Sequence, residues 1–316
     1  MCSLSICLLF APRAPAFDKK SSAALSHYIM GVFHEDLGDI DKAIEEYKAV
    51  LKSGGESAAV HLSLASGYIK KDQIHKAIEE LNLAARLDPE AVEPHAVLAV
   101  LYSSQNKINL AAVEYEQALK IAAKQQPENI DIYKSLGLLY LQQRKLKEAE
   151  GIFRLITDLS PDETEAYFYL ASVHNELKNN ALAEKELKKA LELKPDYHQA
   201  LNFLGYMYAE GGKNLDKAQL LIKKALELEP DNGAYIDSLG WVYFKKGKTK
   251  EALTELTRAG SLLDDPVIYD HLGDAYLKLN DPDNAILNWQ KSLKLEPGQN
   301  SVKEKLEKLL NARGRR

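Results

Sequence analysis

The sequence contains almost no cysteine. Its 316 residues include two, Cys2 and Cys7, and both lie at the extreme N-terminus. Residues 8–316 therefore cannot form a disulfide framework or a zinc site of the Cys-x-x-Cys type. Cysteine-free domains occur in oxidising and in reducing compartments, so this absence does not assign a compartment.

Long apolar runs and an excess of positive charge are also missing. No stretch reaches the roughly 18 apolar residues that a membrane-spanning helix needs. The formal net charge is −5 and the pI is about 6.0, which gives no basic footprint for nucleic acid. We therefore expect neither a transmembrane helix nor a nucleic-acid partner.

Motifs that carry catalysis or hold a cofactor are absent as well. The sequence has no His-Glu-x-x-His, no glycine-rich phosphate loop and no Gly-x-Ser-x-Gly. His27, His61 and His95 follow one another at a constant interval of 34 residues. Neighbouring helix axes lie about 8–10 Å apart, so equivalent side chains in successive repeats lie about a helix diameter or more apart. Zinc ligands, in contrast, lie about 2 Å from one centre. We expect these histidines to pack, and we expect no enzyme activity, cofactor or metal.

What the sequence does contain is one pattern repeated eight times. A Leu or Met precedes a small residue, and in six copies a tyrosine follows three residues later. His34 and His174 stand in the tyrosine position of the other two copies. The small residues are Gly31, Ala65, Ala99, Gly137, Ala171, Gly205, Gly240 and Gly273. An alanine follows each of them 12 or 13 residues later, at Ala43, Ala77, Ala111, Ala149, Ala183, Ala218, Ala252 and Ala285.

This spacing resembles that of the tetratricopeptide repeat family. The resemblance implies an all-α fold, a right-handed α-solenoid of stacked helical hairpins. The eight repeats are expected at 24–57, 58–91, 92–129, 130–163, 164–197, 198–232, 233–265 and 266–299. Residues 300–316 are expected to form a capping helix and a basic tail. The third repeat carries four extra residues before Pro127, which should lengthen its second helix by about one turn.

Residues 1–16 differ in composition from the repeats. Leu4–Phe10 is a short apolar run, and Ala14-Pro15-Ala16 fits the small-x-small pattern of a signal-peptidase site. The segment therefore reads as a truncated signal peptide, although no Lys or Arg precedes the apolar run. The alternative is a disordered apolar tail. Cys7 lies in a poor lipidation box, because Ile6 stands where a small residue is expected.

The resemblance also implies a partner-binding face. In this family the first helix of each repeat lines the concave side, with exposed side chains at repeat positions two, five, nine and twelve. On these positions we expect a peptide or helix to bind at Phe168, Asn175, Asn202, Tyr206, Asp237, Trp241, Phe244, Asp270 and Asp274. The alternative is that Tyr206 and Trp241 only pack neighbouring repeats together. A chaperone-type carboxylate clamp is not expected, because Leu138 stands where the clamp needs asparagine.

The last three repeats are similar to bacterial tetratricopeptide proteins that are exported or anchored at the outer membrane. The resemblance implies a non-catalytic adaptor or scaffold with a protein or peptide partner. Its expected location is the periplasm or the periplasmic face of the outer membrane, with peripheral membrane association, and otherwise the cytoplasm. The alternative is an accessory factor of a polysaccharide or peptidoglycan machine. The irregular first repeat could pair with a second copy to give a homodimer.

Overall fold

The computed structural model describes residues 22–314, with side chains to residue 312. The predicted signal peptide, both cysteines and the last two arginines lie outside the described residues. Every regular element in the described part of the chain is an α-helix. The all-α solenoid expected from the repeats is therefore confirmed.

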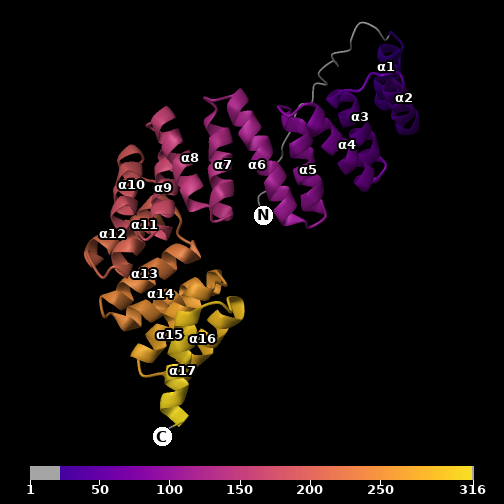
Figure 1. Ribbon diagram of the computed structural model, residues 1–316. Coiled ribbons are helices and arrows are strands. Elements are labelled where there is room, and N and C mark those ends of the chain that lie inside the picture. The colour runs from indigo at the N-terminus through magenta and orange to yellow at the C-terminus, as the bar shows by residue number, and fades with distance from the viewer. Residues whose placement is uncertain (1–21, 315–316) are drawn as a thin grey trace. The chain divides into compact units, whose positions relative to one another are not determined.

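The chain divides into two compact units, Met1–Gln143 and Arg144–Arg316 (Figure 1). The first unit holds α1 (Ser22–Asp36), α2 (Ile40–Lys52), α3 (Ala58–Lys70), α4 (Ile74–Leu87), α5 (Val92–Ser104), α6 (Ile108–Gln125) and α7 (Ile130–Gln142). The second holds α8 (Leu146–Leu159), α9 (Thr164–Glu176), α10 (Asn180–Leu193), α11 (His198–Glu210), α12 (Leu215–Leu228), α13 (Gly233–Lys245), α14 (Thr249–Leu262), α15 (Pro266–Lys278), α16 (Pro282–Leu295) and α17 (Asn300–Gly314).

The small residues of the repeat allow the two helices of each hairpin to approach closely. A Cβ placed on Gly205 of α11 would lie 2.6 Å from Ile222 Cγ1 and 3.1 Å from the Ala218 carbonyl oxygen of α12. These distances are too short for a side chain, so glycine is required by the packing rather than by the backbone conformation. The close approach that the repeat pattern predicts is thus present.

The turn inside each hairpin places a residue in the left-handed region. In most hairpins this is a single residue, such as Asp72 with φ 56° or Gly247 with φ 75°. The sixth repeat has one residue more, and it uses two left-handed positions, Gly212 at 62° and Asn214 at 52°. Glycine and asparagine adopt this conformation at the lowest cost. The Gly211-Gly212 pair is therefore turn chemistry, as the sequence indicated.

Two predicted irregularities are confirmed. Helix α6 has 18 residues where α4 has 14, so the insertion before Pro127 lengthens the helix by about one turn. At the other end, α17 packs on α16 through Val302, which is fully buried, and through Leu306 and Leu309. Helix α17 covers the apolar side of the last hairpin, as a capping helix should.

The histidines at the fourth repeat position pair within their own hairpins. His27, His61 and His95 each bind, through Nδ1, the carboxylate of a glutamate on the second helix. The partners are Glu46, Glu80 and Glu114, at 2.6, 2.6 and 2.7 Å. Each histidine therefore has a local structural partner.

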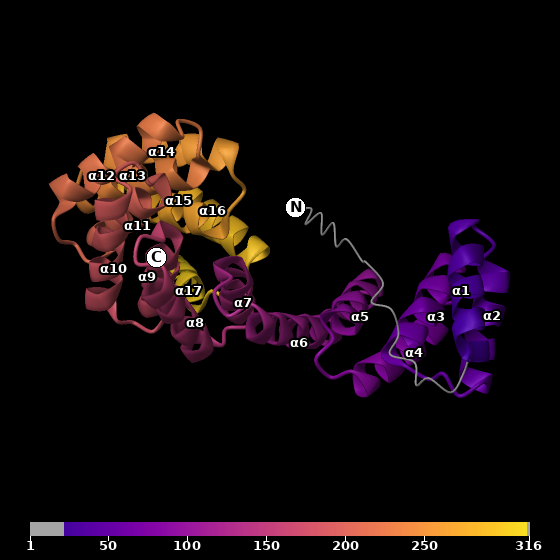
Figure 2. The ribbon, with the colours of Figure 1, turned by 90° about the horizontal axis from the view of Figure 1, so that it is seen from above.

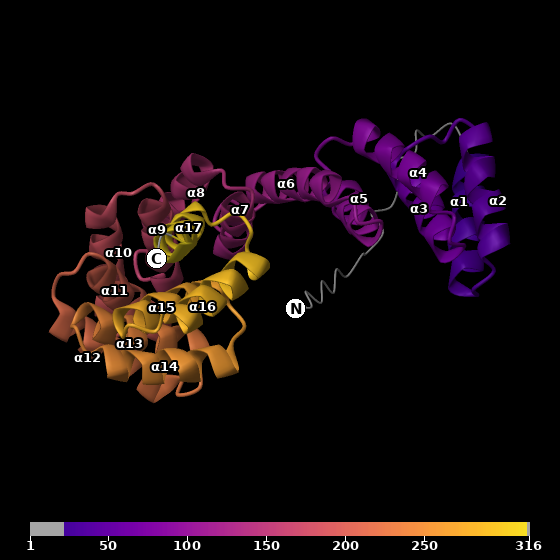
Figure 3. The same cartoon turned by 90° about the horizontal axis from the view of Figure 1, so that it is seen from below.

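The second unit is curved when it is considered by itself. Helices α9, α11 and α13 lie on the inner side of the curve, and α10, α12 and α14 lie on the outer side (Figures 2 and 3). The first helices of these hairpins therefore present their remaining side chains toward the inside. Most of the candidate residues lie on these three inner helices.

Candidate partner-binding site

The structure brings the aromatic candidates together. Phe168 of α9, Tyr206 of α11, and Trp241 and Phe244 of α13 all belong to one apolar cluster on the inner helices of the second unit. Phe168 packs edge-to-face on Tyr197 at 5.4 Å between ring centroids. The nine predicted residues lie on four successive first helices. Besides the aromatic residues, α9 carries Asn175, α11 carries Asn202, α13 carries Asp237, and α15 carries Asp270 and Asp274.

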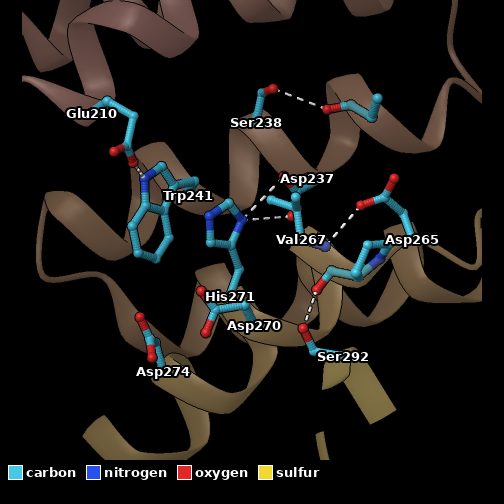
Figure 4. Close-up of polar contacts among 12 residues, drawn as sticks. Glu210, Asp237, Ser238, Trp241, Asp265, Val267, Asp270, His271, Asp274 and Ser292 are labelled. Atoms are coloured by element: carbon cyan, nitrogen blue, oxygen red, sulfur yellow. Dashed lines mark hydrogen bonds and ion pairs between the residues drawn. The ribbon is translucent and has the colours of Figure 1, made fainter. Parts of the chain in front are cut away.

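The exposure of two candidates differs from the expectation. Asp237 and Trp241 are only 5% and 7% exposed, although their repeat positions predict exposed side chains. The other seven are partly buried. The reason is His271, which comes from the following hairpin and packs against both residues (Figure 4).

The His271 ring lies between a carboxylate and an indole. Its Nδ1 lies 2.9 and 3.1 Å from the two carboxylate oxygens of Asp237. A carboxylate only accepts hydrogen bonds, so Nδ1 carries the hydrogen. The same ring stacks on Trp241 at 3.9 Å between centroids and 12° between planes. Trp241 therefore acts as a bridge between the seventh and eighth repeats.

Trp241 is held on its other sides as well. Phe244, one turn later on α13, stacks on the indole at 4.8 Å and 5°. The indole Nε1 donates a hydrogen bond to Glu210 at the end of α11, and the Lys245 ammonium lies 4.7 Å from the ring centroid. Tryptophan is therefore positioned by contacts from three helices.

The acids of α15 are bound by the capping helix. Lys305 of α17 donates to Asp270 at 2.8 and 3.0 Å and to Asp274 at 2.8 Å. Burial alone would lower the pKa of Lys305, but hydrogen bonds to Asp270 and then Asp274 outweigh burial and raise it. Burial raises the pKa of Asp274, and Lys305 opposes that rise. Both inner acids of the last repeat are thus bound by one lysine of the chain, whose single charge balances one of the two carboxylates.

The inner side of α11 has polar atoms of another kind. The side-chain oxygens of Gln199 and Asn202 are buried and have no hydrogen-bond partner in the described part of the chain. They lie one turn apart on the same helix side, and Tyr206 follows one turn later. Burial raises the pKa of Tyr206, and Glu210, Asp237 and Asp270 raise it further. These three acids are therefore near the Tyr206 hydroxyl.

The inner face carries aromatic, amide and carboxylate side chains. His271 and Asp237 form a pair that could move a proton, but the nearby Ser238 hydroxyl donates to the Ala234 carbonyl of its own helix (Figure 4). Within residues 22–314 no group of three His, Cys, Asp or Glu side chains is placed to hold a metal ion. No helix among these residues is both long and apolar enough to cross a bilayer.

Sequence reasoning missed Glu210, His271 and Lys305 as members of this face; the repeat positions did place Gln199 there, although it was not among the nine candidates. His271 could have been found, because it follows Asp237 by 34 residues and so lies near the same level of the next first helix. Lys305 gave no such signal, since α17 is outside the repeat period.

The hairpin stack defines an α-helical repeat protein. More specifically, the chain belongs to the tetratricopeptide repeat family. That family matches residues 30–92, 96–164, 135–198, 170–233 and 267–299, which is more than half of the chain.

Solved structures show the same fold. A tetratricopeptide repeat protein from Parabacteroides merdae is 19% identical, with a TM-score of 0.61 over 80% of this chain and 98% of that one. A chain of the APC/C hetero-tetramer Cut9–Hcn1 is 18% identical, with a TM-score of 0.59 over 86% of this chain and 52% of that one. A thermophilic tetratricopeptide repeat protein from Thermus thermophilus is 21% identical, with a TM-score of 0.50 over 57% of this chain and 98% of that one. At these identities the likeness shows the fold alone. No curated protein matches the sequence.

Proposed function

We propose that the protein is a non-catalytic scaffold that binds an extended protein or peptide segment on the inner side of α9, α11, α13 and α15. The observation that carries this proposal is the pair of unpartnered amide oxygens, Gln199 and Asn202, on α11. A buried acceptor without a partner costs about 1–3 kcal/mol. Main-chain N–H groups of a bound segment would donate to both oxygens after the two amide side chains rotate out of their buried positions, and this would remove that cost.

The surroundings of these amides suit a peptide. Tyr206 follows Asn202 by one turn on α11, and Phe244 of α13 belongs to the same apolar cluster as Tyr206. Both are partly buried aromatic side chains, and such residues commonly anchor partners. Glu210, an exposed acid one turn after Tyr206 on α11, gives this face a negative character. A segment with a Lys or Arg beside an apolar residue would therefore be favoured by charge and by apolar burial.

Site-specific photo-cross-linking tests the location of the site. A benzophenone amino acid would replace Tyr206 on the inner α11, and in a matched variant it would replace Leu220 on the outer α12. Leu220 is 70% exposed and belongs to the same hairpin. We expect a discrete partner to cross-link from position 206 and not from position 220 in the source cell. Equal capture from both positions, or capture from position 220 alone, would move the site away from the inner face.

The partner identified in this way should then be measured with altered amides. We expect Asn202→Leu and Gln199→Leu to weaken its binding by about 1–3 kcal/mol each, because the donors of the partner lose their acceptors. Circular dichroism must show unchanged helix content. Unchanged affinity in both folded variants would remove the amide pair from the proposal, and binding of glycan strands without a protein partner would favour a polysaccharide role instead.

We also propose that the adaptor acts in the bacterial cell envelope. The support is the apolar run Leu4–Phe10 followed by Ala14-Pro15-Ala16. Expression in a bacterial host and N-terminal sequencing test this proposal. A mature chain that starts at Phe17 and fractionates with the periplasm supports export, whereas an uncleaved chain in the cytoplasm contradicts it.

A further inference from the structure

The first helix of the chain has an apolar face that the other first helices bury. Five residues of this face, in α1 and the turn after it, are exposed by 39–66%. They are Leu25, Ile29, Met30, Phe33 and Leu37. Four of them recur every fourth residue and so form one ridge along the helix. We call these five residues the α1 ridge.

In later repeats, the residues at the positions of the α1 ridge contact the preceding hairpin. Ile29 stands at the repeat position of Tyr169, which stacks on Phe153 of the preceding α8 at 5.1 Å. Phe33 stands at the position of Gly67, where an added Cβ would lie 2.8 Å from Ile44 of the preceding α2. Both positions therefore contact the preceding hairpin. The α1 ridge is a stacking face of the same kind.

A comparison along the repeats makes the difference clear. At the position of Phe33 the later repeats carry buried or partly buried side chains, whereas Phe33 itself is 52% exposed. The later residues are Gly67, Leu101, Leu139, Val173, Met207, Val242 and Ala275. At the C-terminal end of the second unit, α17 covers the last hairpin. No described residue covers the α1 ridge in this way.

We propose that the α1 ridge binds the α1 ridge of a second copy of this chain, as an antiparallel, twofold-symmetric helix pair. Two helices with apolar ridges at every fourth residue pack at about −50° with axes about 8–10 Å apart. A twofold axis places the same patch on both sides, so a self-complementary ridge fits this symmetry. The pairing adds an interface without changing either hairpin stack.

The exposed area and the charge of α1 both favour a second copy of the chain as the partner of the α1 ridge. At exposed fractions of 39–66%, five large apolar residues leave on the order of 500 Å² exposed per copy, which is within the range of the largest apolar patch of a typical monomer. Two copies would bury about 1,000 Å², which is the lower limit for a specific interface. Between Ser22 and Phe33 the helix has no Asp, Glu, Lys or Arg, and His27 is bound to Glu46. Like charges would therefore not meet across the twofold axis, and a strongly charged partner would find no complement.

Sedimentation and light scattering of the full chain test the proposal. We expect the wild-type chain to show twice the 35.3 kDa chain mass at micromolar concentration. Phe33→Asp should weaken the dimer by about 30-fold or more, since it buries a carboxylate in each half of the interface. Leu220→Asp on α12 is the matched control, because Leu220 is 70% exposed outside the ridge. That variant should remain dimeric.

Disulfide trapping gives a second, independent measurement. In a chain with Cys2 and Cys7 changed to Ser, an Ile29→Cys copy should cross-link with a Phe33→Cys copy, because antiparallel packing brings these positions together. A Leu220→Cys copy should not cross-link. A monomeric wild-type chain, or a dimer unaffected by Phe33→Asp, overturns the proposal. In the first case the ridge serves residues before Ser22 or another protein.

The test is independent of the proposed function. The α1 ridge lies in the first unit, whereas the proposed partner site lies in the second unit. We expect Phe33→Asp to leave partner cross-linking from position 206 unchanged. Loss of the dimer and loss of the partner are therefore distinguishable.

Discussion

Single glycines decide how tightly a hairpin can close. Gly273 on α15 faces Trp289 on α16, and an added Cβ would lie 2.4 Å from the indole Cδ1 and Nε1 atoms. Trp289 is 1% exposed, so it has no room to move away. A methyl group at this position must therefore separate the two helices or distort the indole.

We expect Gly273→Ala to lower the free energy of unfolding of the second unit by about 1–3 kcal/mol, because it overpacks the hairpin. Gly151→Ala in α8 is the matched control, since a Cβ there meets nothing within 4 Å. In a helix interior that change should raise the free energy of unfolding by about 0.5–1 kcal/mol. Urea unfolding followed by tryptophan fluorescence measures both. Equal effects of the two changes would show that helix propensity, rather than packing, sets the requirement.

His61 is a buried residue whose charge depends on pH. Its Nδ1 lies 2.6 Å from Glu80 and its Nε2 lies 3.3 Å from Glu56. Only the doubly protonated ring donates to both carboxylates. The hydrogen bond to Glu80 raises the pKa of His61 above its ordinary 6.5, against the effect of burial. Protonation therefore stabilises the folded first unit.

The sign of the pH effect follows from the raised pKa. The stabilisation is complete below the unfolded pKa of about 6.5 and is lost as the pH rises through the higher folded pKa. We expect the urea concentration at the unfolding midpoint of the first unit to decrease as the pH rises above about 6.5 and through the higher folded pKa, and we expect His61→Gln to flatten this dependence. Circular dichroism in urea measures it. His75→Gln is the control, because the His75 side chain is 90% exposed. If His75→Gln removes the slope as well, His61 is not its source.

At the scale of the element, α17 differs from the other sixteen helices of the described chain in lying outside the hairpin period. It contributes an apolar contact through Val302 and an ionic contact through Lys305. The apolar contact of Val302 covers the buried residues Ala285 and Trp289 of the last hairpin. The ionic contact binds Asp270 and Asp274, so the positive charge of Lys305 balances one of these two carboxylates of α15 in the free chain.

We expect Val302→Asp to detach α17 and to cost about 3 kcal/mol or more, because it places a carboxylate at a fully buried site. Lys303→Asp introduces the same side chain one residue later at an exposed position and should change stability little. Hydrogen exchange of the α17 amides, together with urea unfolding, measures the effect. Protected α17 amides in Val302→Asp would show that Val302 does not hold the helix.

At the scale of the whole molecule, repeat contacts are local and each unit has its own apolar clusters. The clusters around Leu64 and around Leu204 share no residue. Stability in such a chain is approximately a sum over neighbouring repeats. A defect in one unit should therefore have little effect on repeats that are several hairpins away.

The two tryptophans, Trp241 and Trp289, make this testable because both lie in the second unit. Leu64 is fully buried in the first unit, so Leu64→Ala should cost about 2–5 kcal/mol there. We expect the circular dichroism transition to begin at lower urea while the tryptophan transition stays in place. An equal shift of both signals would mean that the chain unfolds as one cooperative body.

The sequence by itself determined the helices, the repeat period, the longer α6 and the capping helix. These features follow from local patterns: apolar residues at helical spacing, glycine and asparagine at turns, and proline after helix ends. The period also placed Phe168, Tyr206, Trp241 and Phe244 on successive first helices, and the structure gathers them in one cluster.

Only the tertiary structure decided which side chains of the inner face remain exposed or without a hydrogen-bond partner. Asp237 and Trp241 stand at repeat positions that predict exposed side chains, yet His271 of the next hairpin covers them. Lys305 reaches Asp270 from a helix outside the repeat, and the oxygens of Gln199 and Asn202 are left without partners in the described part of the chain. A repeat pattern specifies contacts inside a hairpin and between equivalent positions. It does not specify how far the particular side chains of a neighbouring hairpin extend, and that reach sets the burial and the hydrogen bonding of the inner face.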